Sequence, residues 1–234
     1  MPRLLLVHGS AADHTAWSIQ LASPLKEQFT LDAYDRGPGS VEEQADVAAA
    51  RVHGPTMIVG SSFGAVVALE LLRRHPGLCA GAVLIEPPMA PSDDTAAAPA
   101  RFLDEFDRIA RDEGGPAAGE FFLRQVLTDA LYDRIPKPFQ DRSKAKWAEI
   151  RADSEALIAY KPRYAELRAI HTPVQLVGGE KSPPYFRATL DALFAHLPDA
   201  RIEIIRGAGH MLHAEAHRSF HEVLLRFAAD IRFC

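Results

Sequence analysis

The sequence predicts an α/β fold with a mostly parallel six-stranded sheet and helices on both faces. Short apolar runs alternate with helix-length stretches, and 234 residues suit one domain with one large core. The runs are rich in Val, Leu and Ile and bounded by Gly or Pro, as strands buried on both faces should be. We expect strands at 3–7, 30–34, 56–59, 82–85, 174–177 and 201–205. The helices between and after them should lie at 17–28, 41–52, 65–75, 186–196 and 214–231.

The segment 87–168 breaks this alternation because it contains no strand pattern. Helix candidates occur instead at 101–113, 117–131 and 143–160. An all-helical insertion between two strands predicts a cap over the carboxyl ends of the strands, where open α/β sheets bind ligands. The chain would then divide into a core, residues 1–86 and 169–234, and a helical cap, residues 87–168.

Composition argues against several classes of function. With a net charge of −5 and an isoelectric point near 6.1, the chain lacks the basic surface typical of nucleic-acid binding. No run is apolar enough to cross a membrane, and the N-terminus does not resemble a secretion signal. Cys79 and Cys234 lie far apart, which favours free thiols in a reducing compartment. We expect a cytoplasmic protein with a small-molecule substrate and no nucleic-acid or membrane partner, and a homodimer stays open.

The main functional signal is the G-x-S-x-G sequence at 60–64, between a predicted strand and a predicted helix. A strand–turn–helix around this sequence forces the serine onto a sharp turn at the carboxyl edge of the sheet, with its hydroxyl exposed. Gly60 and Gly64 are needed because side chains there would collide with the neighbouring strand and helix. The alternative is a glycine-rich turn without chemistry. We predict Ser62 as a nucleophile.

A serine hydroxyl needs a base within hydrogen-bond reach to attack near neutral pH. His210 ends the Gly-Ala-Gly-His sequence that follows the last predicted strand, so it should lie at the same sheet edge as Ser62. The His-Gly-Ser sequence after the first strand can turn there and aim the Ser10 N–H toward the space above Ser62. The Phe63 N–H would supply a second donor, and two such donors form an oxyanion hole.

Together these segments resemble the α/β-hydrolase superfamily over nearly the whole chain. His8-Gly9 resembles the oxyanion loop of that family, and the sequence at 35–40 resembles a shortened form of its D-x-R-G-x-G-x-S turn. The sequences at 60–64 and 207–210 match its nucleophile elbow and histidine loop. The resemblance implies an α/β-hydrolase fold in a compact version that lacks the two leading strands. It also implies no cofactor and no metal.

The acid of the implied triad departs from the commonest family pattern. The segment resembling G-E-x-D has Ser182 where an aspartate is expected, and Glu180 starts two residues too early. Glu86 ends the strand after the nucleophile strand, the place that the acid takes in some members, including haloalkane dehalogenases. A carboxylate there is costly to bury unless it is paired. We predict Glu86 as the acid and keep Glu180 as the alternative.

The sequence thus predicts a serine hydrolase that cleaves a small, fairly apolar ester, lactone or thioester. The alternatives are a cofactor-free lyase or other non-hydrolytic enzyme, a thioesterase for carrier-bound acyl chains, and a non-catalytic ligand-binding receptor. Aromatic residues of the cap fit a pocket lining and a cap core equally well; they are Phe102, Phe106, Phe121, Phe122, Tyr132, Phe139, Trp147 and Tyr160. His213, His217 and His221 have four-residue spacing, for which we expect a solvated helix face rather than a metal site.

Overall fold

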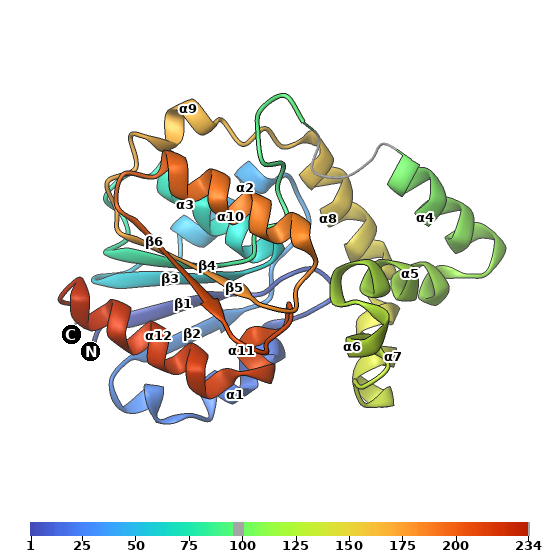
Figure 1. The fold of residues 1–234 in the computed structure, drawn as a ribbon, viewed down its shortest axis with the longest axis horizontal. Coiled ribbons are helices and arrows are strands. Elements are labelled where there is room, and N and C mark those ends of the chain that lie inside the picture. The colour runs from blue at the N-terminus through green and yellow to red at the C-terminus, as the bar shows by residue number, and fades with distance from the viewer. Residues whose placement is uncertain (96–100, 234) are drawn as a thin grey trace.

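The protein is described from a computed structural model, which covers residues 1–95 and 101–233 (Figure 1). Its centre is a six-stranded sheet in the order β2-β1-β3-β4-β5-β6, and every neighbouring pair is parallel. The strands are β1 (Arg3–Val7), β2 (Thr30–Tyr34), β3 (Thr56–Ser61), β4 (Gly81–Ile85), β5 (Val174–Gly179) and β6 (Ala200–Ile205). The predicted α/β fold with six strands is confirmed.

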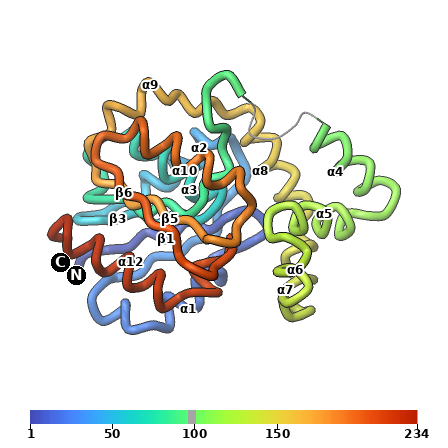
Figure 2. Tube along the Cα trace, in the orientation of Figure 1, coloured from blue at the N-terminus to red at the C-terminus, as the bar shows by residue number. Residues whose placement is uncertain are grey.

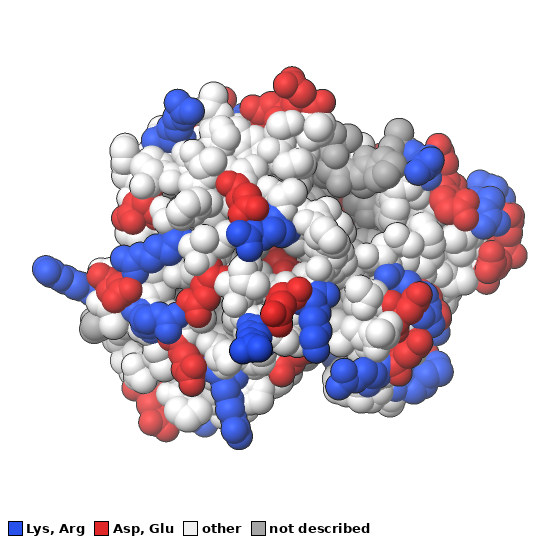
Figure 3. Space-filling view, in the orientation of Figure 1, with Lys and Arg blue, Asp and Glu red and all other residues white. Residues whose placement is uncertain are grey.

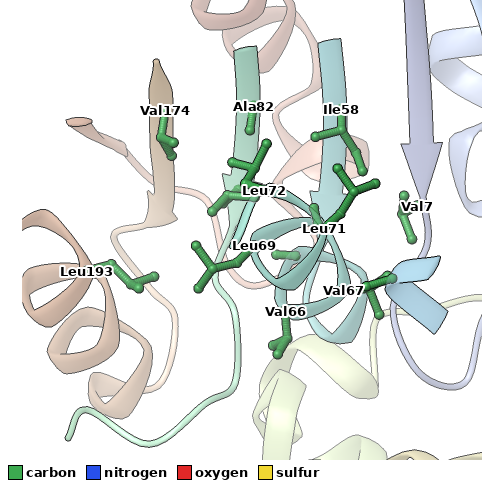
Figure 4. Close-up of a cluster of buried hydrophobic side chains, with 14 of the residues drawn as sticks. Val7, Ile58, Val66, Val67, Leu69, Leu71, Leu72, Ala82, Val174 and Leu193 are labelled. Atoms are coloured by element: carbon green, nitrogen blue, oxygen red, sulfur yellow. The ribbon is translucent and has the colours of Figure 1, made fainter. Parts of the chain in front are cut away.

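Helices cover both faces of this sheet (Figure 1). On one face lie α2 (Val41–Ala49), α3 (Phe63–Arg74), α9 (Tyr164–Leu167) and α10 (Pro184–His196). The other face carries α1 (Ser18–Leu21), α11 (Leu212–Glu215) and α12 (His217–Asp230), with 3-10 turns at His14–Trp17 and Pro24–Glu27. Successive strand residues point to opposite faces, so Leu5 and Val7 join one apolar core while Leu4 and Leu6 join the other. Figure 4 shows the first core around α3.

Two helices expected to be continuous are divided. The 17–28 stretch contains α1 and the 3-10 turn Pro24–Glu27, because Pro24 cannot donate a helical N–H. Ser23 instead caps this turn by accepting from the Leu25 N–H. The 214–231 stretch is interrupted at Ala216, whose φ of −122° and ψ of 40° separate α11 from α12. In both stretches the apolar pattern of the sequence continues through the break, so the interruption comes from local backbone geometry.

Between β4 and α9, the described residues form helices and no strands. They are α4 (Arg101–Asp112), α5 (Gly115–Leu127), α6 (Asp129–Tyr132), α7 (Lys137–Ala145) and α8 (Trp147–Ala159). These helices lie to one side of the sheet (Figure 1; Figure 2). They bury an apolar cluster of their own, which includes Phe106, Leu123 and Ile150, and Ala11 from the loop after β1 packs into it. The helical segment therefore rests on that loop.

The surface charges, the helices and Cys79 bear on the expectations drawn from composition. Acidic and basic side chains are interspersed over the face shown in Figure 3, without a large single-sign patch there. Within residues 1–95 and 101–233, no helix has the length and apolar character that a membrane span requires. Cys79 is a buried free thiol, and burial raises its pKa to about 12. Cys234 lies outside the described residues.

Candidate active site

Ser62 lies on the sharp turn between β3 and α3. Its φ of 54° and ψ of −125° place it in a sparsely populated region of backbone space. Such a conformation persists only where its surroundings hold it, and here the Ser62 N–H donates to the Ile85 carbonyl at 2.8 Å. The side chain is half-buried and lines a pocket at the carboxyl end of β3.

Two glycines allow this turn to pack against its neighbours. A Cβ on Gly64 would lie 2.3 Å from the Val7 carbonyl oxygen and 2.6 Å from that of His8. A Cβ on Gly60 would lie 2.3 Å from the Gly64 carbonyl oxygen. All of these neighbours are backbone atoms, so a side chain at either position would displace β1 or α3. The predicted need for both glycines is confirmed.

We expect Gly64→Ala to lower the free energy of unfolding by about 3 kcal/mol or more, because overpacking against backbone cannot relax by a rotamer change. Urea denaturation measures this effect. Gly37→Ala is the matched control, since a Cβ there meets nothing within 4 Å, and its effect should stay below about 0.5 kcal/mol. Similar losses in the two variants would contradict the steric explanation.

His210 and Glu86 are in direct contact. His210 lies on the loop between β6 and α11, and its Nδ1 is 2.6 Å from Glu86 Oε2. Only 4% of His210 and 1% of Glu86 are exposed. Glu86 Oε1 accepts from the Gly179 N–H at 2.7 Å, and the His210 ring stacks on Phe186 with centroids 4.2 Å apart. Because Nδ1 faces the carboxylate, the other ring nitrogen, Nε2, is the one left to accept a proton.

The two candidate acids are placed differently. Glu86 directly follows β4 and, like Ser62, has a positive φ, of 44°. Glu180 is exposed, and its Oε2 accepts from the Gly207 N–H at 2.7 Å, in the loop that leads to His210. Glu86, and not Glu180, is therefore the carboxylate against the imidazole. Ser182, at the position where the family pattern has an aspartate, is a buried hydroxyl without a hydrogen-bond partner among the described residues.

The loop after β1 passes directly over the Ser62 turn. A Cβ on Gly9 would lie 2.9 Å from Ser62 Cβ and 3.5 Å from Ser62 Oγ. Ser10, the next residue, lines the same pocket as Ser62. Phe63 is the first residue of α3, where a backbone N–H has no acceptor within the helix. The two residues predicted to supply the oxyanion hole are thus the neighbour of Ser62 in the chain and a residue that lines the same pocket. Their role stays a prediction.

The pocket has a volume of about 400 Å³ and lies between the carboxyl edge of the sheet and the helices α5 to α7. Ser62 and His210 both line it. Most of the remaining wall is apolar, and the contributions of the helical segment include Phe122, Leu123, Val126, Leu127, Leu131, Ile135 and Phe139. Of the aromatic residues of the predicted cap, Phe122, Tyr132 and Phe139 line the pocket, whereas Phe106 and Tyr160 are buried away from it.

The expectation of a solvated histidine face is wrong for His213. The break at Ala216 places His213 on α11 and separates it from His217 and His221 on α12. His213 is 2% exposed, and its ring lies 4.8 Å from that of Trp17. Neither ring nitrogen has a hydrogen-bond partner within the described part of the chain, and burial lowers the pKa of His213 to about 4. The imidazole therefore packs as a neutral aromatic ring.

This burial predicts acid sensitivity. Between the ordinary pKa of 6.5 and the lowered value of about 4, the unfolded chain binds a proton at His213 and the folded chain does not. The contribution of His213 to the free energy of unfolding is therefore fully present above about pH 6.5 and decreases as the pH falls below that value. Between pH 7 and pH 5 the decrease is about 2 kcal/mol. His213→Phe should reduce the difference between urea-unfolding free energies at these pH values. His53→Gln, at an exposed histidine, should leave it unchanged.

A buried ionic cluster, which was not expected from the sequence, lies beneath the loop after β1. Arg36 and Asp153 form an ion pair of 2.8 Å there, with side chains 5% and 9% exposed. His8 packs with them, and burial lowers its pKa to about 4. In the sequence, the cluster could have been anticipated from Arg36, which belongs to the Asp-Arg-Gly-Pro-Gly-Ser turn. Its partner Asp153 lies 117 residues away in α8 and has no local motif.

Comparisons with known proteins agree with this fold. The alpha/beta hydrolase family matches residues 4–223. A pimeloyl-[acyl-carrier protein] methyl ester esterase from Aromatoleum aromaticum is 29% identical, over 89% of this chain and 91% of that protein. MenH from S. aureus superposes with a TM-score of 0.78 at 16% identity, covering 99% of this chain and 94% of that one. A carboxylesterase from Bacillus subtilis gives 0.73 at 21% identity, covering 97% and 83%.

The family match spans almost the whole core and the helical segment between β4 and β5. The predicted resemblance and the predicted six-stranded α/β-hydrolase fold are confirmed. The chain belongs to the α/β-hydrolase family.

Proposed function

We propose that the protein is a carboxylic ester hydrolase in which Ser62 is the nucleophile, His210 the general base and Glu86 the orienting acid. The observation that carries this proposal is the 2.6 Å contact between His210 Nδ1 and Glu86 Oε2, combined with the shared pocket of His210 and Ser62. The carboxylate holds one ring nitrogen, which leaves the other to act on the hydroxyl in that pocket.

In the first half of the reaction, His210 Nε2 takes the proton from Ser62 Oγ as that oxygen attacks the substrate carbonyl carbon. The backbone N–H groups of Ser10 and Phe63 hydrogen-bond the oxyanion that develops. Glu86 stabilises the imidazolium, which then gives its proton to the leaving alcohol or thiol. An acyl group remains bonded to Ser62.

In the second half, a water molecule takes the place of the leaving group. His210 removes its proton, and the hydroxide attacks the acyl carbon. The proton returns to Ser62 Oγ as the acyl–oxygen bond breaks, so a carboxylic acid leaves and the enzyme is restored. The same residues therefore act twice in one cycle.

The pocket supports a small and fairly apolar substrate: a carboxylic ester, lactone or thioester. Its volume of about 400 Å³ suits a small molecule, and its walls are largely aliphatic and aromatic. The name of the relative from Aromatoleum aromaticum describes a methyl ester as substrate, which supports an ester among these classes. That name also describes a carrier-bound acyl chain, so a thioesterase or a carrier-dependent esterase is tested in the same screen.

The test is intact-mass analysis after treatment with a fluorophosphonate, followed by peptide mapping and a screen of short-chain esters, lactones and thioesters. We expect one adduct, located on Ser62, and hydrolysis of at least one ester class. An adduct on another residue would overturn the assignment of the nucleophile. Failure to label well-folded protein would favour a non-hydrolytic enzyme or a ligand-binding receptor on the same fold.

A further inference from the structure

The buried Arg36–Asp153 pair connects the helical segment to the loop after β1. Asp153 belongs to α8, whereas Arg36 follows β2 in the core. Both Arg36 Nη atoms donate to the carboxylate, Nη2 at 2.8 Å and Nη1 at 3.2 Å, and Nη1 also donates to Gln44. A two-pronged contact of this kind sets the orientation of the guanidinium plane.

The remaining donors of Arg36 hold the backbone of the loop. Nε donates to the His8 carbonyl at 2.8 Å, and Nη2 donates to the Gly9 carbonyl at 3.1 Å. The Arg36 backbone N–H donates to His8 Nε2 at 3.1 Å, which assigns the ring proton to His8 Nδ1. That nitrogen lies 2.8 Å from the Gly9 oxygen and donates to it. The Gly9 carbonyl is therefore held by two donors.

This arrangement determines where the Ser10 N–H points. The Gly9 carbonyl and the Ser10 N–H belong to one planar trans peptide group, in which they point in opposite directions. A carbonyl fixed toward Arg36 therefore fixes the N–H away from it. The Ser10 hydroxyl adds a second restraint, because it donates to Asp153 Oδ2 at 2.7 Å.

Arg36 also contacts the residue that carries the other proposed donor. Its guanidinium carbon lies 4.5 Å above the centre of the Phe63 ring, within the range of a favourable cation–π contact. One buried group thus contacts the Phe63 ring and the carbonyl of the Gly9–Ser10 peptide group. The N–H groups of Phe63 and of that peptide are the two that would form the oxyanion hole.

We propose that Arg36 is a positioning residue for the oxyanion hole, and that Asp153 transmits the placement of α8 to it. This inference rests on the proposed function, because the oxyanion hole is part of that mechanism. Arg36 and Asp153 act through the loop backbone and touch no reacting atom. A shift of α8 would then change the aim of the Ser10 N–H and so the rate of acyl transfer.

The test compares Asp153→Ala with the matched control Asp107→Asn. Asp107 of α4 forms an ion pair of 2.7 Å with Arg151 of α8, the helix of Asp153. This pair is more exposed than Arg36–Asp153 and donates no hydrogen bond to the loop. With p-nitrophenyl butyrate, we expect Asp153→Ala to lower kcat about 10- to 100-fold, less than the about 10²–10³-fold typical of deleting a donor outright. KM should stay close to that of the wild type, and Asp107→Asn should change neither constant.

Two further measurements separate positioning from a general structural role. The pH profile of kcat should keep its shape in Asp153→Ala, because the His210–Glu86 contact is untouched. Asp153→Asn keeps an acceptor for Ser10 and should recover part of the lost kcat. Arg36→Lys keeps the positive charge but cannot donate to both loop carbonyls and Asp153 together, so its kcat should fall as in Asp153→Ala.

A wild-type kcat in Asp153→Ala and Arg36→Lys would overturn the inference. A rise in KM with kcat unchanged, or an equal loss in Asp107→Asn, would also overturn it. The rate of fluorophosphonate labelling gives the same comparison without a substrate, and melting temperatures confirm that each variant is folded at the assay temperature. Failure of the proposed function is distinguishable, because it appears as unlabelled wild-type Ser62 before any variant is compared.

Discussion

Ser62→Ala is expected to abolish fluorophosphonate labelling and to lower kcat for ester hydrolysis by about 10⁶-fold. The alanine cannot form the acyl intermediate, and the remaining pocket only binds substrate. KM should change little, since the variant removes a single oxygen from a preformed pocket of about 400 Å³. Mass spectrometry measures the adduct, and steady-state kinetics with a chromogenic ester measure the rate.

Ser61→Ala is the control for this experiment. Ser61 is the preceding residue at the end of β3, it also lines the pocket, and it is 4% exposed. A second hydroxyl is thus available within the same turn. Ser61→Ala should keep labelling and most of the activity. Loss of the adduct in Ser61→Ala instead of Ser62→Ala would overturn the proposed nucleophile.

Glu86→Gln is expected to lower kcat by about 10³- to 10⁴-fold, as amide substitution does in related triads. The glutamine can present its NH₂ group to His210 Nδ1, which favours the ring tautomer that cannot accept a proton at Nε2. It also removes the charge that stabilises the imidazolium. The loss should appear in kcat and in the rate of fluorophosphonate labelling, because both depend on the base.

Glu180→Gln is the matched carboxylate control. Glu180 accepts from the Gly207 N–H at 2.7 Å, so this variant tests whether support of the histidine loop, without contact to the ring, explains the effect. We expect it to keep most of the activity. A large loss in Glu180→Gln with little loss in Glu86→Gln would show that the 2.6 Å contact of Glu86 with His210 is not the catalytic one.

Local sequence was sufficient for the sheet and the Ser62 turn. The strands at Arg3–Val7 and Thr30–Tyr34 have the bounds expected from their apolar runs. The glycines of the G-x-S-x-G sequence are required by contacts between adjacent elements. A short window of sequence is therefore enough to predict that both are needed. Parallel strand order then brings the loop of His210 to the same edge as Ser62.

The identity of the carboxylate at His210 depended on the tertiary structure. Both Glu86 and Glu180 follow strands at the correct edge, and a residue count along the chain cannot say which side chain reaches the imidazole. The choice is made by the direction of each side chain where its strand ends. Glu86 turns inward at a positive φ toward Nδ1, whereas Glu180 turns outward to the backbone of Gly207.

Sequence alone was enough to predict the α/β fold, the Ser62 turn, the loop of His210 and the family, because each depends on residues that are close in the chain or on the repeat of an element. The tertiary structure was needed to choose Glu86 over Glu180 as the carboxylate at His210, and to reveal the burial of His213 and the Arg36–Asp153 pair. Each of these joins segments far apart in sequence; 124 residues separate Glu86 from His210, and 193 separate His213 from Gln20, which contacts it. Such contacts depend on packing angles and side-chain directions, and no periodic sequence pattern accompanies them.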